Sequence, residues 1–192
     1  SSGDTLVVAA GTYNECVALV GLDLTIVGAG SSSTVLDGGG ACSFVVDASQ
    51  GETLSLTGFT LNNNGQRGLH GDEATLVLDD VAFEDLGAGS VYGGAVYLDE
   101  GSLDGSNLIF SANTGYAGAA LFALDEAVVV LTDSIFTGNT AVYGGAVYLA
   151  DDGGDVFLDL VDCAFMDNYA TYVGGGIFAD DEAVVTSLRT VW

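Results

Sequence analysis

The sequence predicts an all-β solenoid, a single-stranded parallel β-helix in which each coil supplies three short strands. A Phe-x-x-Asn segment recurs along the chain, followed each time by a run of Gly and Ala and then an aliphatic and an aromatic residue. The anchoring aromatic residues are spaced by 27, 26, 29 and 27 positions, at Phe83, Phe110, Phe136, Phe165 and Trp192. Such a period is typical of one solenoid coil, and we expect coils of about 22–30 residues. The chain contains 29 Gly and no Pro, and no apolar run approaches the roughly 18 residues of a membrane helix.

The strands of one coil can be placed in the unit that follows Phe136. We expect strands at 146–149, 155–160 and 162–165, separated by turns rich in Gly and Asp. Side chains alternate between the two faces of a strand, so the positions that are always apolar should face the interior: Val96, Leu98, Leu121, Ala123, Val147, Leu149, Ile177 and Ala179. The aromatic residues between them should face outward: Tyr97, Phe122, Tyr148 and Phe178. Coils about 4.8 Å apart stack equivalent residues into columns, and about seven coils would span roughly 35 Å.

The asparagine of each repeat predicts a structural ladder at a tight turn. Its members are Asn64, Asn113, Asn139 and Asn168. Asn tolerates the left-handed backbone of a sharp corner, and its amide can bond to the next Asn and to buried backbone. Each coil has the same buried backbone groups that need hydrogen-bond partners at this turn, so we interpret the recurring Asn residues as structural and not catalytic. Leu86 takes the place of Asn in one coil, where we expect the least regular turn.

A single domain is expected, because no charged or Ser-rich linker interrupts the repeats. Residues 1–50 would form the opening coils of the β-helix, and residues 51–192 the repeat coils. The chain begins without Met and stops at an anchor position of the repeat, so we expect it to be a piece of a longer protein.

These motifs resemble a known family. The paired FxxN and GGA[ILV] motifs are similar to the repeats of the polymorphic outer membrane proteins of bacterial surfaces, which are right-handed parallel β-helices. GDTLVVAAGTY at 3–13 and LTIVGAGSSSTVLDGGG at 24–40 resemble the opening coils of pectate-lyase-like secreted β-helix proteins. The resemblance implies a right-handed β-helix displayed outside the cell, associated with a bacterial outer membrane and acting as an adhesive or structural passenger.

The charge balance excludes some partners. Asp and Glu number 27 against two basic residues, Arg67 and Arg189, and the formal net charge is −25. Such a chain would repel nucleic acids and anionic membranes.

Acidic pairs follow the aromatic strand at corresponding turns. The residues of interest are Asp99, Glu100, Asp125, Glu126, Asp151, Asp152, Asp180 and Asp181, preceded by Asp72 and Glu73. If they stack, carboxylates would lie about 5 Å apart in a row that requires counterions. Oxygen ligands at this density suit Ca²⁺, which would then be the only cofactor. The alternative is a solvated acidic edge, because no EF-hand or nonapeptide calcium motif is present.

The outward aromatic column allows two interpretations. Stacked rings on neighbouring strands stabilise a sheet by themselves, and an exposed strip could also bind a glycan or a protein. His70 belongs to the same column. Together with Arg67 and Asp72 it could form a carbohydrate-active site, although a satisfied surface loop is the simpler interpretation. We therefore expect no catalytic residues and no enzymatic activity.

The cysteines suggest an oxidising compartment. Cys16 and Cys42 are separated by about one coil length, so a disulfide between neighbouring coils is plausible. Cys163 shares the inward parity of Phe165 and should be buried.

These observations favour an extracellular structural or adhesive module whose partners are surface proteins, glycans or copies of itself. Two alternatives stay open: a glycan-binding or carbohydrate-active domain near Arg67 and His70, and a subunit of a filament or surface layer that pairs through open strand edges.

Overall fold

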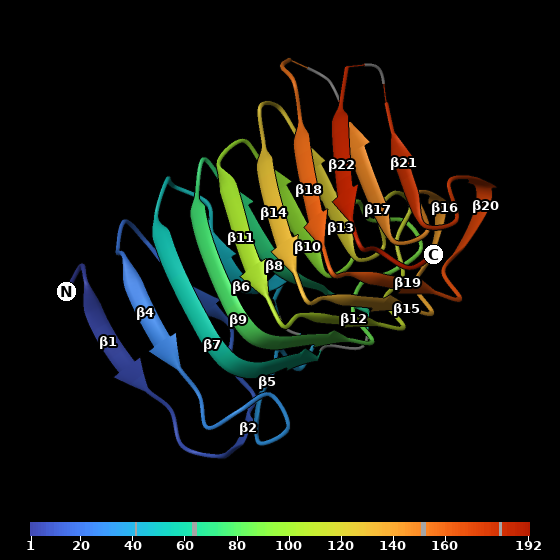
Figure 1. Ribbon diagram of the computed structural model, residues 1–192. Helices are drawn as coiled ribbons and strands as arrows, with labels where there is room; N and C mark the ends of the chain where they lie inside the picture. The colour runs from blue at the N-terminus through green and yellow to red at the C-terminus, as the bar shows by residue number, and fades with distance from the viewer. Residues whose placement is uncertain (41, 63–64, 151–152, 181) are drawn as a thin grey trace.

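The computed structural model describes residues 1–40, 42–62, 65–150, 153–180 and 182–192. It is a right-handed parallel β-helix of about seven coils, as the sequence predicts (Figure 1). Strands from successive coils lie side by side along the whole chain, from the N-terminus at one end to the C-terminus at the other. Within the described ranges, no helix has the length and apolar character needed to cross a membrane.

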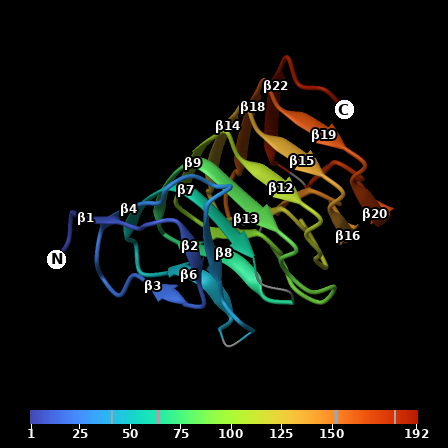
Figure 2. The ribbon, with the colours of Figure 1, turned by 90° about the horizontal axis from the view of Figure 1, so that it is seen from below.

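Three strand positions recur from coil to coil, and all pairs are parallel. The first face contains β1 (Asp4–Val7), β4 (Leu24–Val27), β7 (Thr53–Asn62), β9 (Thr75–Glu84), β11 (Ser102–Ser106), β14 (Val128–Thr132), β18 (Phe157–Val161) and β22 (Val184–Leu188). The second contains β2 (Gly11–Tyr13), β5 (Thr34–Asp37), β12 (Ile109–Ser111), β15 (Ile135–Thr137) and β19 (Ala164–Met166) (Figure 2). The second halves of β7 and β9 complete this face, since β7 pairs with β5 and β9 pairs with β12. The third contains β3 (Val17–Ala18), β6 (Phe44–Ala48), β8 (Arg67–Asp72), β10 (Val96–Asp99), β13 (Leu121–Leu124), β17 (Val147–Ala150) and β21 (Ile177–Ala179).

The predicted strands of the coil after Phe136 are present, shifted by one or two residues. The three expected segments correspond to β17, β18 and β19. The shift at β19 has a clear cause, because Asp162 adopts a positive φ of 54° and turns the chain between two strands. An additional pair, β16 (Thr140–Tyr143) and β20 (Tyr169–Val173), forms a two-stranded sheet that was not predicted.

The interior contains a stack of Phe side chains, and the exposed Trp192 caps it at the C-terminal end. Phe83, Phe110, Phe136, Phe165 and Trp192 form a continuous column with centroid distances of 4.9, 4.6, 4.4 and 4.8 Å and interplanar angles of 19° or less. The aliphatic residues predicted to face inward are fully buried in the coils of β10, β13 and β17. In the last coil Ile177 is half-buried and Ala179 is exposed, because β21 has a sheet neighbour on one side only.

The asparagine column makes the hydrogen bonds expected of a ladder. Asn139 Oδ1 accepts from the backbone and side-chain nitrogens of Asn113 at 3.1 and 3.0 Å, and its Nδ2 donates to Phe110 O and Asn168 Oδ1 at 3.0 and 2.9 Å. Asn64 lies outside the described residues. Leu86 is fully buried at the same position of its coil, and its backbone N–H donates to Asn113 Oδ1 at 3.1 Å. The ladder therefore ends at Leu86, whose backbone N–H is satisfied by the Asn of the next coil.

Sharp corners recur as regularly as the strands. Asp80, Asn107, Asp133, Asp162 and Arg189 occupy one corner with φ between 49° and 54°. This left-handed backbone disfavours most side chains and tolerates Gly, Asn and Asp. A second corner holds Asp85, Ala112, Gly138 and Asp167, with φ between 52° and 64°. The left-handed residue therefore precedes each ladder position, and the expectation that the Asn itself adopts this backbone is wrong. Part of the acidity of the chain therefore follows from the geometry of its turns.

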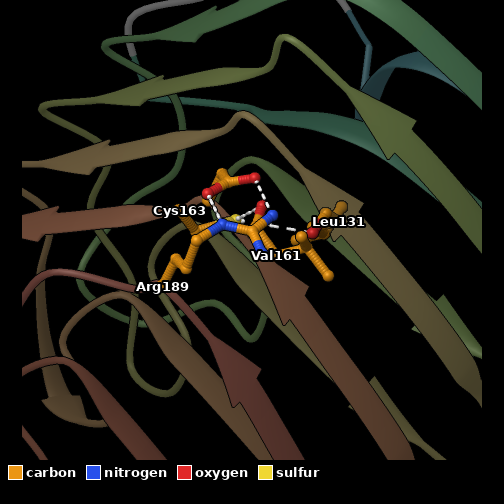
Figure 3. A network of polar contacts seen from close by, with 5 residues as sticks. Leu131, Val161, Cys163 and Arg189 are labelled. Carbon is orange, nitrogen blue, oxygen red and sulfur yellow. Dashed lines mark hydrogen bonds and ion pairs between the residues drawn. The ribbon is translucent and has the colours of Figure 1, made fainter.

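The corner at Arg189 lies beside a buried thiol (Figure 3). Arg189 forms a two-pronged ion pair with Asp162, the residue at the same corner of the preceding coil. Hydrogen bonding to this guanidinium lowers the pKa of Asp162. Cys163 is buried, as predicted, with its sulfur 3.5 Å from the carbonyl oxygens of Leu131 and Val161, and burial raises the pKa of its thiol.

Cys16 and Cys42 form a disulfide that joins two of the opening coils, with Cα atoms 6.3 Å apart. The bond closes a segment with a sequence separation of 26 and ties the β2–β3 region to the segment that precedes β6. It lies at the end of the solenoid where β1 and β2 are largely exposed.

Replacement of Asn139 by Ala should destabilise the protein by about 2–4 kcal/mol, because it leaves buried backbone and side-chain groups of the neighbouring coils without partners. Urea unfolding followed by circular dichroism measures the change. Thr140→Ala is the matched control, since Thr140 is exposed and adjacent. Equal effects of the two substitutions would contradict a structural role for the ladder.

Removal of the disulfide by Cys16→Ala together with Cys42→Ala should cost about 3.5 kcal/mol, the chain-entropy value for a loop of this size. In a solenoid each coil contacts only its neighbours, so the loss should be local. Hydrogen exchange should show faster exchange in β4 and β5 and unchanged exchange in β14 and β15. Uniformly faster exchange along the chain would show that the opening coils are not a separate unit.

Candidate binding groove

A column of aromatic side chains runs along the outer side of the third face. Tyr97, Phe122, Tyr148 and Phe178 occupy equivalent positions of β10, β13, β17 and β21, in direct parallel register. Successive ring centroids lie 5.4, 5.3 and 5.1 Å apart. The predicted aromatic column is therefore present, and the register of the sheet positions its rings.

The prediction that this column forms an open outward strip is wrong. Phe122 is only 5% exposed, and Tyr97, Tyr148 and Phe178 are half-buried. The cover comes from a second row of tyrosines, on the segments that precede the third-face strands: Tyr92, Tyr116, Tyr143 and Tyr172. Tyr92 packs edge-on against Phe122 at 5.1 Å, and Tyr143 lies 6.5 Å from Phe178.

The tyrosine row has its own regular contacts. Tyr116 is 5.4 Å from Tyr92 and 5.5 Å from Tyr143, in both cases edge-on, and Tyr143 is 5.5 Å from Tyr172. A sequence signal for the row exists, because a Tyr lies one or two residues before a Gly in every repeat. These segments were predicted only as Gly-rich turns, so the row was missed.

Close backbone packing holds the tyrosine segments against the sheet. Gly144 has a φ of 55°, and a Cβ atom there would lie 2.1 Å from the carbonyl oxygen of Val147. Gly118 has a φ of 57° and would meet Leu121 O at the same distance. Any larger residue would push the chain away from the sheet. These two glycines therefore fix the height of Tyr143 and Tyr116 above the column.

A cavity of about 360 Å³ lies between the two aromatic rows. It is open to solvent, and its lining residues are Tyr92, Tyr116, Ala117, Tyr143, Tyr148, Phe178 and Asp180. We call this cavity with its lining the tyrosine groove. Its volume is at the lower end of the range of small-molecule pockets, about 300–1,000 Å³.

One carboxylate marks the rim of the groove. The hydroxyl of Tyr148 donates to Asp180 Oδ2 at 3.1 Å. Burial, followed by this hydrogen bond, raises the pKa of Tyr148 to about 12. The pKa of Tyr143 is also raised, chiefly by the neighbouring Tyr116. Both phenols are therefore neutral at physiological pH.

Arg67 and His70 lie beside the N-terminal end of the column. The guanidinium carbon of Arg67 is 4.3 Å from the ring centroid of Phe44 and 5.7 Å from that of Tyr97. His70 stacks on Phe44 at 4.3 Å, and its Nδ1 is 2.9 Å from Asp47 Oδ1. Burial lowers the pKa of Arg67. Both basic side chains thus take part in aromatic packing, and Asp72 lies in the same strand, β8.

The described acidic pairs crowd one another on neighbouring coils: burial, followed by the charges of Glu73, Asp99 and Glu126, raises the pKa of Glu100. Asp99 is in register with Asp72 on one side and with Leu124 on the other. Glu100, Asp125 and Glu126 adopt left-handed φ values of 57°, 51° and 62°, so they serve as corner residues. Asp151, Asp152 and Asp181 lie outside the described residues. Among the residues that are described, no three Asp, Glu, His or Cys side chains are grouped so that they could hold a metal ion.

Comparison of the chain with protein-family models and with curated protein sequences finds no match. The likeness to the polymorphic outer membrane protein repeats therefore depends on the motifs of the sequence.

Replacement of Asp99 by Asn should stabilise the protein at neutral pH. Burial, followed by the charges of Asp125 and Asp72, raises the pKa of Asp99 in the folded state. A raised folded-state pKa means that stability increases as the pH falls from neutral through that pKa, and that the increase is complete below the ordinary Asp pKa of about 3.9.

The variant should therefore gain up to about 1 kcal/mol at pH 7 and show a flatter dependence of melting temperature on pH between neutral and acid. Thermal unfolding at a series of pH values measures both changes. Asp104→Asn, at an exposed position of β11, is the control and should change neither. A lower melting temperature for Asp99→Asn at pH 7 would show that the carboxylate has a favourable partner.

Proposed function

We propose that this protein is an extracellular binding module, a rigid β-helix displayed at a bacterial cell surface that attaches to its partner through the tyrosine groove. The single observation that carries the proposal is the groove itself, formed by two aligned rows of aromatic side chains over several coils. Exposed aromatic residues with polar tips are characteristic of binding surfaces, since each ring offers a large contact area at low cost in side-chain entropy.

Further features support this proposal. The Cys16–Cys42 disulfide suits a compartment outside the reducing cytoplasm. The Asn ladder and the Phe column give a stiff scaffold on which groove residues from different coils keep fixed spacings. The proposed module binds and does not catalyse, because Arg67 and His70 are occupied by aromatic packing and by Asp47.

A flow-adhesion assay tests the proposal. Beads coated with the purified protein would be passed over a printed glycan array and over mucin-coated glass. We expect the beads to be retained on at least one of these surfaces. The double variant Tyr116→Ala/Tyr143→Ala should reduce this retention about tenfold, the loss typical of removing two central aromatic contacts. Tyr169→Ala is the matched control, because Tyr169 is 59% exposed on β20 and does not line the groove.

Retention that the double variant leaves unchanged would locate binding elsewhere on the solenoid and overturn the role of the groove. Absence of retention on every surface would contradict adhesion to glycans and mucin. A concentration-dependent increase in mass by analytical ultracentrifugation would instead favour the filament alternative, since β1 and β22 each have one sheet neighbour.

A further inference from the structure

The groove combines ring faces with an excess of negative charge. Five aromatic rings line the cavity: Tyr92, Tyr116, Tyr143, Tyr148 and Phe178. Edge-on contacts at 68° between Tyr92 and Tyr116 and at 66° between Tyr116 and Tyr143 turn the lining rings in different directions around the space, in contrast to the parallel stack of the inner Phe column. Rings that face a common space from several sides form a cage.

Aromatic faces carry partial negative charge and attract cations that approach within about 6 Å of the ring centroid. Asp180 adds a carboxylate at the rim, and the chain as a whole has a formal charge of −25. The field of the protein therefore concentrates cations near this groove and repels anions.

The chemistry of the lining distinguishes between kinds of cation. A primary ammonium is strongly hydrated and needs acceptors for its three N–H groups. A quaternary ammonium has no N–H group, spreads its charge over methyl groups and is recognised by aromatic cages. Five of the seven lining residues are aromatic, and Asp180 already accepts a hydrogen bond from Tyr148. The lining therefore suits the quaternary ion better than the primary one.

We propose that the tyrosine groove binds a quaternary ammonium group of the choline type, with the cation among Tyr92, Tyr116, Tyr143 and Tyr148 and with Asp180 at the rim. This inference rests on the binding function proposed above and specifies the chemical class of its ligand. Among the glycans on the adhesion surfaces, those that carry a quaternary ammonium group would gain most from the acidic surroundings, which repel carboxylate and sulfate groups.

Isothermal titration calorimetry of the intact protein with choline and with 3,3-dimethyl-1-butanol tests the proposal. The alcohol has the same shape and lacks the charge. We expect choline to bind about tenfold or more tightly, the difference that cation–π contact with several rings provides. Equal affinities for the two compounds would overturn the proposal. So would the absence of any binding heat with choline at concentrations up to about 50 mM, which is far above the dissociation constants of specific complexes.

Variants then locate the site. Tyr143→Phe keeps the ring and should bind choline within about twofold of the unmodified protein, whereas Tyr143→Ala should lose about tenfold. Asp180→Asn should lose about threefold, and Tyr169→Ala should lose nothing. A melting curve of each variant confirms that the fold is retained. An equal loss with Tyr169→Ala and Tyr143→Ala would place the binding of choline outside the groove.

A second arm separates choline from phosphocholine. The phosphate of phosphocholine lies beside its ammonium and would be repelled by the acidic surroundings, so we expect weaker binding than for choline. Tighter binding of phosphocholine would show recognition of phosphate and overturn the proposal.

The adhesion assay keeps the two proposals distinct. Choline would be added to the adhesion assay at about 20 mM, enough to occupy even a weak site. Tyrosine-dependent retention that choline does not reduce would support the binding module and reject the quaternary ammonium group as its ligand. Choline binding without tyrosine-dependent retention would support the cage and reject adhesion to the surfaces tested.

Discussion

The parallel register between successive coils is the constraint on which the rest of this structure depends. Each strand of β10, β13 and β17 meets its neighbour without a shift, so equivalent residues repeat at the spacing of paired strands, about 4.8 Å. That spacing suits stacked aromatic rings and bonded amides. It explains why the interior holds a column of Phe and why Asn113, Asn139 and Asn168 satisfy one another.

The same register explains much of the unusual composition. A three-sided coil must turn sharply at fixed positions, and at these corners the chain adopts a left-handed backbone in coil after coil. Asp and Asn serve there repeatedly, as at Asp80, Asn107 and Asp133. The cost of the repetition is electrostatic, because carboxylates on neighbouring coils approach one another, and the raised pKa of Asp99 reflects this crowding together with burial. Corner geometry thus accounts for acidic residues that a count of charges alone would assign to ion binding.

The sequence predicted the solenoid, the inner columns and the third-face aromatic column, because each depends on a residue that recurs once per coil on a strand of known parity. It did not predict the groove. Strand parity places Phe122 on the outer side, but whether that side is open depends on where the preceding segment folds. That segment contains Tyr116, and its path is set by the close approach of Gly118 to the backbone of Leu121, a contact that no periodicity reveals. Strand ends were misplaced for a related reason, since the corner at Asp162 is decided by φ and not by hydrophobic pattern.

The groove shows how a solenoid can form a concave site from coils that enclose no space individually. One coil contributes one ring to the sheet and one ring to the segment above it, and neither encloses any space alone. When coils stack, both rings repeat at the coil spacing and form two rows. The ring planes of Tyr143 and Phe178 are inclined by 53° with centroids 6.5 Å apart, which leaves room between the rows. Small residues set the depth of this space, because Ala117 forms part of the lining and Gly144 lets the tyrosine segment approach the sheet. A binding site of this type is extended or removed by changing one residue per coil, while the columns that hold the fold together stay the same.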